Sequence, residues 1–538
     1  MAYTPSLDPN LYVTAGASVD QKYMDQMAGQ DRTPVATDTK LPRVTLVVGP
    51  SPFSMPRGWE FFLTSPYEGI SYIATVLHNA GYPVRIVDVR YEIDPLRAAY
   101  DQIMEGTDVL GLATYEDCYP FLESLIAKVK EDAPKMPIIL GGSLVTSVPH
   151  VFMRETKADV AVISEGEITI LEVMEAYTLG AWAIRLAEIK GIWYRDAAGQ
   201  VHKNLPRGQM ANLNSLPKMR LDLWPQAKSA MGLQPQIIAS YSRGCKMDCS
   251  FCYRTTPQER VKSPEKLNEE LAFYKKNYAI DFVFFVDLTF TAHKKQTIEY
   301  CEVIQDHDIG WTCLTRNADV DPERLTAMKK AGCDIALYGV ETLTPDALKE
   351  ARKGSTENIV IRAMKQSWDA GVRYGGLTIV GLPGESEESL DHMCKWAEEH
   401  RHITRVKYLS AMPGTTVYQQ GLQDGHINSE TEHLNWLAVE QALERDEFLN
   451  YNNLPDSVMR QAYKRIYDSY QPGPVMGFKH YPEHFAYFDP DATRDWRAAY
   501  SSAGAHLVPG TEQFQGLHPA SEGVTLTNVR ASEHLAQV

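Results

Sequence analysis

The chain contains little cysteine: eight residues in 538, three of which lie between positions 245 and 252. So few thiols, placed so unevenly, do not make a disulfide framework, and we expect a reducing, cytoplasmic location. An excess of basic residues is also absent, because the formal net charge is −16. A nucleic acid or an anionic membrane surface is therefore not expected as the main partner.

Long hydrophobic runs are absent as well. No apolar stretch approaches the roughly 20 residues that a membrane-spanning helix needs. The first residues lack a basic segment followed by an apolar one, so we expect no secretory signal. What remains, with 44% hydrophobic and 23% charged residues, is the composition of a globular protein, and the length suggests two or three domains.

Short apolar runs alternate with helical stretches in two blocks of an α/β chain. Residues 41–180 predict a doubly wound, Rossmann-like (flavodoxin-like) parallel sheet. Residues 236–425 hold six strand–helix repeats, which are too few for a closed eight-unit barrel and predict a partial (βα)6 barrel. Around them we expect an irregular N-terminal arm (1–40), a linker (181–235), a mainly helical C-terminal region (426–508) and a polar tail (509–538).

The carboxyl ends of parallel strands are where such sheets bind ligands. In the first block these ends carry glycine and polar residues, and glycine either lets a ligand approach the backbone or simply completes a turn. The candidate ligand contacts are Pro50, Ser51, Tyr115, Glu116, Gly141, Gly142, Ser143, Ser164, Glu165 and Gly166.

Three cysteines, Cys245, Cys249 and Cys252, form the pattern C-x3-C-x2-C directly after the first strand of the second block. Cysteine thiolate is the usual ligand of a [4Fe–4S] cluster. Three thiolates on one loop would bind three irons and leave the fourth open to a small molecule. Zinc is the alternative, but it needs a fourth cysteine or histidine nearby, and the next ones, His293 and Cys301, fall in other segments.

This spacing resembles the radical S-adenosylmethionine (SAM) superfamily, down to the aromatic residue before the third cysteine. The resemblance implies that SAM chelates the open iron and is cleaved to a 5′-deoxyadenosyl radical. It implies further that Asp287 holds the methionine amine, in place of the Gly-Gly-Glu of many members, and that Arg316 and Glu341 hold the carboxylate and the ribose. The full set of implied SAM contacts is Phe251, Asp287, Arg316, Glu341, Ile379, Gly381 and Pro383.

Each of these positions also has a purely structural alternative. Asp287 is suited to capping the helix that follows it. Arg316 and Glu341 stand at adjacent strand ends, where charged residues often form an ion pair. The Gly-Leu-Pro-Gly segment from Gly381 suits any tight turn.

A second resemblance covers residues 42–178. The run from Ile139 to Ser143, the run from Val160 to Glu167 and the stretch after Pro66 look like the cobalamin-binding domain fused to one branch of radical SAM enzymes. The resemblance implies cobalamin at the strand-end residues named above. These positions also satisfy a generic flavodoxin-like fold, and the D-x-H-x-x-G motif of proteins that ligate cobalt through histidine is absent.

Together the resemblances imply a radical SAM methyltransferase, in which the radical abstracts hydrogen from carbon and a methyl group is then transferred from methylcobalamin. Cyclisation, ring rearrangement or C–C bond formation without methyl transfer, as in the anaerobic porphyrin cyclases, is the first alternative. A non-catalytic iron–sulfur and cobalamin sensor is the second. We expect a small-molecule, lipid, tetrapyrrole or peptide substrate, and an electron donor such as flavodoxin or ferredoxin.

Overall fold

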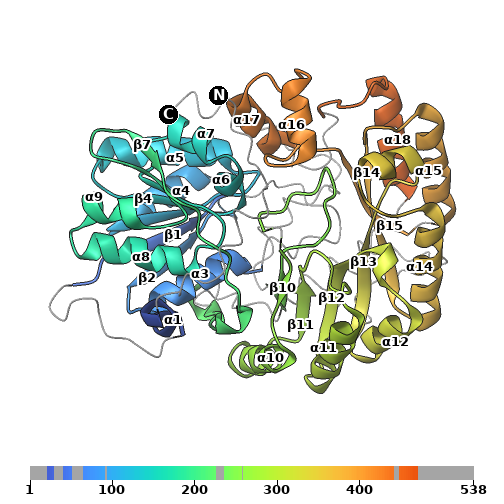
Figure 1. The fold of residues 1–538 in the computed structure, drawn as a ribbon, viewed down its shortest axis with the longest axis horizontal. Helices are drawn as coiled ribbons and strands as arrows, with labels where there is room; N and C mark the ends of the chain where they lie inside the picture. Colours follow the sequence, from blue (N-terminus) through green and yellow to red (C-terminus); the bar gives the residue numbers. More distant parts are fainter. Residues whose placement is uncertain are drawn as a thin grey trace.

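The computed structural model describes residues 21–28, 40–50, 65–90, 92, 94–225, 236–256, 258–400, 402–440 and 448–469. Within them, two largely parallel sheets stand side by side, each with its own layer of helices (Figure 1). The expectations for Ser51, for most of the arm 1–40, for residues 470–508 and for the tail 509–538 lie outside the described residues.

The N-terminal sheet has the strand order β2-β1-β3-β4-β5-β6-β7. Its first five strands are parallel, and their order is that of a flavodoxin-like sheet, which reverses direction between β1 and β3. This confirms the predicted Rossmann-like architecture. The strands are β1 (Val44–Val48), β2 (Val84–Asp88), β3 (Val109–Ala113), β4 (Ile138–Gly141), β5 (Val160–Val162), β6 (Ile192–Arg195) and β7 (Val201–Lys203).

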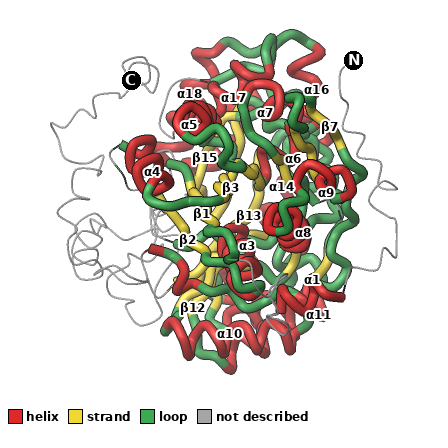
Figure 2. The backbone as a smooth tube through the Cα atoms, turned by 90° about the vertical axis from the view of Figure 1, so that its left-hand side faces the viewer, coloured by secondary structure: helices red, strands yellow, loops and turns green. Residues whose placement is uncertain are grey.

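Helices cover both faces of this sheet, so its central strands are buried on both sides. Apolar side chains of α1, α3 and α8 form one core layer, and those of α4, α5 and α7 form the other. Figure 2 shows α4 and α5 on one side of the strands and α8 on the other. The helices are α1 (Gln21–Ala28), α3 (Glu68–Asn79), α4 (Pro95–Met104), α5 (Tyr119–Asp132), α6 (Ser143–Ser147), α7 (Pro149–Glu155), α8 (Glu167–Thr178) and α9 (Trp182–Arg185).

Helix α1 lies within residues 1–40, which were expected to form an irregular arm. Helices α6, α7 and α9 and strands β6 and β7 were not predicted either. Strands β6 and β7 form an antiparallel hairpin that extends the sheet, within residues expected to be only a linker. All three residues of β7 are exposed, so no apolar face marks the strand in the sequence. Helices α6 and α7 fill the stretch between β4 and β5, and α6 is too short to show a helical period.

The second half is a six-stranded parallel sheet in the order β8-β11-β12-β13-β14-β15. Within the described residues β8 and β15 are its two ends, which agrees with the predicted partial barrel. The strands are β8 (Gln236–Ala239), β11 (Phe282–Phe285), β12 (Gly310–Thr315), β13 (Cys333–Glu341), β14 (Arg373–Val380) and β15 (Ile403–Tyr408). The outer helices are α10 (Pro264–Tyr278), α11 (Lys294–Asp306), α12 (Pro322–Lys330), α13 (Pro345–Glu350), α14 (Glu357–Ala370) and α15 (Glu387–His400).

Strand β14 holds two glycines near its start, and they conceal that start in the sequence. A larger side chain would not fit at either of these glycines. A Cβ atom on Gly375 would lie 2.7 Å from Leu337 Cδ2, and one on Gly376 would lie 2.8 Å from Ile403 Cδ1. Neighbouring strands therefore exclude larger side chains from this part of the barrel.

The C-terminal region is helical where it is described, with α16 (Thr416–Gln423), α17 (Glu430–Glu440) and α18 (Asp456–Ser469). Helix α18 packs on α15 and β15, whereas α17 packs on α5 and α7 of the other half. His150 Nε2 lies 2.9 Å from Glu430 Oε2 across this contact. The C-terminal region thus joins the two halves. None of the described helices is long and apolar enough to cross a membrane.

Candidate active site

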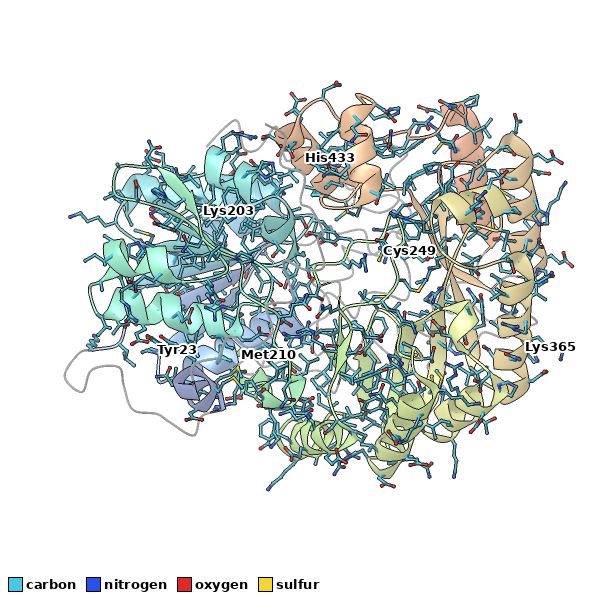
Figure 3. The ribbon with its side chains drawn as sticks, in the orientation of Figure 1. Tyr23, Lys203, Met210, Cys249, Lys365 and His433 are labelled. Atoms are coloured by element: carbon cyan, nitrogen blue, oxygen red, sulfur yellow. The ribbon has the colours of Figure 1, made fainter. Side chains whose placement is uncertain are left out.

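The cysteine loop follows β8 and is closed at its base by the antiparallel pair β9 (Ser242–Arg243) and β10 (Arg260–Val261). Gly244 starts the loop at φ +85°, and a Cβ atom there would lie 2.0 Å from the Gln258 carbonyl oxygen, so only glycine fits. Cys245 is buried, and Cys249 and Cys252 are half-buried. Figure 3 shows Cys249 in the middle of the molecule, far from Lys365 on the outer helical layer.

The three thiols suit a cube better than a single ion. Among the described residues, no three Cys, His, Asp or Glu side chains converge on one point as the ligands of a single metal ion would. In a [4Fe–4S] cube each thiolate binds a different iron, so convergence on a point is not required. Burial raises the pKa of Cys249, and that of Cys252 to about 11, so binding iron must release protons.

Charged side chains from two strand ends and from the turn after α13 gather beside the cysteines. Glu341 ends β13 at φ +62°, and its Oε1 accepts a 2.5 Å hydrogen bond from Lys353 Nζ. The charges of Lys353, Glu341 and Arg316 all act on the pKa of Cys249, after burial. The structure therefore brings two predicted SAM residues together and adds Lys353, which the sequence analysis missed because no motif marks it.

Arg316 and Glu341 are not paired with each other, which was their structural alternative. Arg316 Nη1 lies 3.0 Å from Asp319 Oδ2, and its Nη2 donates to the Lys353 carbonyl at 2.9 Å. Its Nε is buried and has no hydrogen-bond partner. One donor thus remains available to a ligand carboxylate.

Asp287 lies beneath the cysteine loop and does not cap the next helix. Its carboxylate accepts hydrogen bonds from the backbone N–H groups of Tyr241 and Ser242 and from the Ser242 hydroxyl. Glu68, at the start of α3, accepts from Ser240 N–H and Oγ at 3.0 and 2.9 Å. One carboxylate from each half therefore fixes the three residues that lead into the loop.

An apolar wall lies beside these charges. Phe251 and Ile379 pack against the same small cluster, which includes Ala347 and Leu382. Pro383 is half-buried in the loop that follows, where Gly381 has φ +97°. A Cβ atom on Gly381 would lie 2.6 Å from Met459 Cε of α18, so the C-terminal region covers this predicted SAM loop.

The end of the N-terminal sheet has a different character. Gly142, at φ +117°, packs on the backbone of Thr114, whose carbonyl oxygen would lie 2.8 Å from a Cβ atom on Gly142. A Cβ atom on Gly141 would meet nothing within 4 Å. Ser143 Oγ donates to the Thr114 carbonyl at 3.4 Å. The end of β4 thus presents open backbone at Gly141, as a large ligand requires.

The loop after β5 is adjacent. Ser164 has φ +67°, and its buried Oγ has no hydrogen-bond partner. Gly166 precedes α8, where a Cβ atom would lie 3.2 Å from Ile73 Cδ1. These residues fit a ligand with peripheral amides, such as cobalamin. Pro50 is half-buried, directly after β1.

Glu165 is engaged in the contact between the two halves. Its carboxylate binds Arg243 at 3.0 Å, Arg260 at 2.9 Å and the Met210 N–H at 2.7 Å. Glu167 Oε1 lies 2.6 Å from the other Arg243 nitrogen. The loop predicted to bind cobalamin is thereby tied to the strand that precedes Cys245.

A second link joins the halves on the other side of the cysteine loop. Tyr253, directly after Cys252, receives a hydrogen bond from Ser147 Oγ at 3.4 Å. The charge of Glu116 acts on the pKa of Tyr253, which burial raises above its usual range. Tyr115 stacks edge-on against Tyr67, with ring centroids 5.2 Å apart. The cysteine loop and the end of the N-terminal sheet therefore face one another.

Comparison with known families agrees with this arrangement. The family model of the radical SAM superfamily matches residues 239–397, and that of the B12 binding domain matches residues 64–174. The chain belongs to the radical SAM superfamily, in the branch that carries a B12-binding domain. It is therefore a radical SAM enzyme, and the two domains imply a [4Fe–4S] cluster, SAM and cobalamin as its cofactors.

Curated relatives include two kinds of enzyme. An uncharacterized methyltransferase of Pyrococcus horikoshii is 26% identical over 478 residues, which cover 86% of this chain and all of that protein. An anaerobic magnesium-protoporphyrin IX monomethyl ester cyclase of Rubrivivax gelatinosus is 26% identical over 349 residues, covering 62% of each.

Solved structures share the fold. The methyltransferase TsrM of Kitasatospora setae, with cobalamin and a [4Fe–4S] cluster bound, aligns with a TM-score of 0.59 at 15% identity and covers 80% of this chain and 90% of that one. The cobalamin-dependent enzyme OxsB aligns with a TM-score of 0.56 at 18% identity and covers 74% of this chain. The chain spans about half of OxsB, 56% of its length.

Proposed function

We propose that this protein methylates an unactivated carbon of its substrate, with Cys245, Cys249 and Cys252 as the ligands of the cluster. When bound, the cluster and SAM supply a 5′-deoxyadenosyl radical, and cobalamin supplies the methyl group. The observation that carries the proposal is the pair of links, Glu165–Arg243 and Ser147–Tyr253, which hold the cysteine loop against the open end of the N-terminal sheet. A radical formed at one end and a methyl donor at the other can then reach one substrate carbon.

In this proposal the protein binds and orients the cofactors and the substrate, and it excludes water from them. Arg316 Nε and Glu341 would hold SAM, and Phe251 and Ile379 would form an apolar wall that excludes water from it. Asp287 and Glu68 hold the start of the cysteine loop from below. No side chain is needed as a general base, because hydrogen abstraction by a radical moves the proton and an electron together.

Cobalamin is assigned to the open ends of β1, β3, β4 and β5. Gly141 would let the ring approach the backbone, and Ser164 Oγ would gain a hydrogen-bond partner. Glu165 is better placed to join the two halves than to contact the cofactor. Flavodoxin or ferredoxin as the electron donor, and a cytoplasmic location, also stay proposals, and the eight free thiols suit a reducing compartment.

The products distinguish methyl transfer from the alternatives. The protein is reconstituted anaerobically with iron, sulfide and hydroxocobalamin, then given SAM and a strong reductant. Methyl transfer predicts two products: 5′-deoxyadenosine, from cleavage, and S-adenosylhomocysteine, from methyl donation to the corrinoid. S-adenosylhomocysteine should be absent when cobalamin is omitted.

Cyclisation is the second candidate, because cyclases are among the relatives at 26% identity. It predicts 5′-deoxyadenosine without corrinoid-dependent S-adenosylhomocysteine. A sensor would form neither product. Zinc, or no metal, in place of iron would contradict all three.

A further inference from the structure

Lys353 is a buried cation beside the cysteine loop that no motif marks. Its side chain is 10% exposed, and Nζ lies 2.5 Å from Glu341 Oε1 and 5.8 Å from the ring centre of Phe251. Phe251 is the residue between the second and third cysteines that directly precedes Cys252. The ammonium group therefore lies against the loop itself and not on the outer surface.

The backbone is arranged to direct this side chain inward. Helix α13 ends at Glu350, and Arg352 and Gly354 on either side of Lys353 have φ of +52° and +62°. Such values are costly for a residue such as Arg352 and persist only where surrounding contacts enforce them. Cys249 Sγ lies 3.9 Å from the Arg352 carbonyl, and Ser250 N–H donates to the Ala351 carbonyl at 3.0 Å. This turn and the cysteine loop are thus packed on each other.

Space for the ion pair comes from Gly339. A Cβ atom there would lie 2.4 Å from Glu341 Oε1 and 2.6 Å from Lys353 Nζ. Burial works against a charge on Lys353, but the Glu341 carboxylate outweighs it and leaves the pKa of Lys353 above its ordinary value. The cation is therefore present throughout the neutral range.

Two cations near the loop, apart from Arg316, are less suited to act on a cluster. Arg254 and Arg352 share Asp248, at 2.7 Å each, and the Asp248 side chain is 58% exposed. Solvent screens such exposed pairs strongly. A buried charge acts through a lower effective dielectric and is felt at longer range.

We propose that Lys353 is a positioning residue whose charge sets the reduction potential of the cluster held by Cys245, Cys249 and Cys252. This inference rests on the proposed function. Reduction adds one negative charge to the cluster, and a fixed cation nearby stabilises that charge. Net charge and hydrogen bonds around a cluster are known determinants of its potential. Glu341 opposes Lys353 in this role, so the pair sets the potential together.

The test is an EPR-monitored redox titration of the anaerobically reconstituted full chain, without SAM. Lys353→Met keeps the length of the side chain and removes the charge. The reduction equilibrium should become about tenfold less favourable, which for one electron is a shift of about 59 mV to more negative potential. Lys353→Arg should restore the wild-type potential. Lys349→Met, on the exposed side of α13, is the matched control and should not shift it.

Glu341→Gln provides the opposite sign, because it leaves the cation uncompensated, and should raise the potential. A wild-type potential in Lys353→Met would overturn the proposal. If Lys353→Met fails to retain a cluster, Glu341→Gln decides: a raised potential supports the proposal and an unchanged one overturns it. A wild-type protein that assembles no cluster refutes the proposed function and this inference together, whereas a normal cluster with unshifted potentials refutes this inference alone.

Discussion

The two sheet ends that face each other at the centre of the molecule differ in the state of their polar groups. At the barrel end, Glu341 is paired with Lys353, and Asp287 is saturated by backbone donors. At the N-terminal end, Gly141 faces open space and Ser164 Oγ has no partner. The barrel end is preorganised around charge, as a cluster and a sulfonium cofactor demand. The N-terminal end offers backbone and shape, which suit a large ligand rich in neutral amides.

Removing one thiolate ligand should abolish cluster binding at the barrel end and leave cobalamin binding at the N-terminal end intact. This is the largest effect that we expect. Cys249→Ala is expected to lose the visible absorbance of the cluster, because one of its thiolate ligands is missing, and to form no 5′-deoxyadenosine. Its affinity for hydroxocobalamin should stay within about twofold of wild type, because the N-terminal residues are untouched.

Cys301→Ala is the control for that substitution. Cys301 is a buried cysteine of α11, so this variant should retain iron and activity at a small cost in stability. Wild-type iron content in Cys249→Ala would contradict the ligand assignment. Loss of cobalamin binding in that variant would show that the two ends are not independent.

Lowering the pH should reduce the stability of the barrel, because His402 is buried between Trp368 and Tyr374. Burial lowers the pKa of His402 from 6.5 to about 4. The unfolded chain therefore binds this proton more tightly, so stability is complete above about pH 6.5 and falls as the pH drops towards 4, by up to about 3 kcal/mol.

His402→Phe keeps a ring in the stack and removes the titration. Urea unfolding at pH 7 and pH 5 should give a smaller loss of stability in this variant than in wild type. His392→Phe, at an exposed histidine of α15, serves as the comparison. An identical pH dependence in His402→Phe and wild type would count against this cause.

Asp287→Ala tests whether the carboxylate fixes the start of the cysteine loop. The change leaves the N–H groups of Tyr241 and Ser242 buried without a partner, and each unsatisfied group costs about 1–3 kcal/mol. We expect a loss of about 2 kcal/mol in unfolding free energy, together with incomplete cluster assembly. Asp369→Ala, which breaks an exposed pair with Lys365, should cost less than about 0.5 kcal/mol. Equal losses in the two variants would rule out the supporting role.

Gly141→Val should act only on the N-terminal end, with the smallest effect. The new side chain enters open space, so folding is unchanged, but it occupies the position assigned to the corrin ring. Hydroxocobalamin affinity measured by spectral titration should fall about tenfold, about 1.4 kcal/mol, with a normal iron content. Gly208→Val, at another open glycine, should leave the affinity unaltered. An unchanged affinity for hydroxocobalamin in Gly141→Val would contradict the assignment of the corrin ring to this strand end.

Much of this comparison follows from the sequence because its signals are local. Apolar periodicity predicts the parallel strands of both sheets, and the spacing of Cys245, Cys249 and Cys252 indicates their chemistry directly. The order of strand-end motifs places Arg316 and Glu341 near the cysteines, as the structure does.

The remainder depends on contacts between segments far apart in the chain. Lys353 follows an ordinary helix end, and only the fold brings it to Glu341. Glu165 resembles a ligand residue until Arg243, 78 positions away, occupies its carboxylate. Asp287 is bound to the strand that precedes the cysteines, 45 positions upstream, which no helix-capping pattern indicates. The strands β6 and β7 are concealed because β7 has no buried face.

The central claim is that the cluster and the corrinoid lie close together between the two sheet ends. Pulsed EPR on protein that holds a reduced cluster and cob(II)alamin measures this most directly, since both centres are paramagnetic. A resolved dipolar coupling between them, absent in Cys249→Ala, is the predicted result. Two uncoupled signals, in protein that carries both centres at full occupancy, would contradict the account.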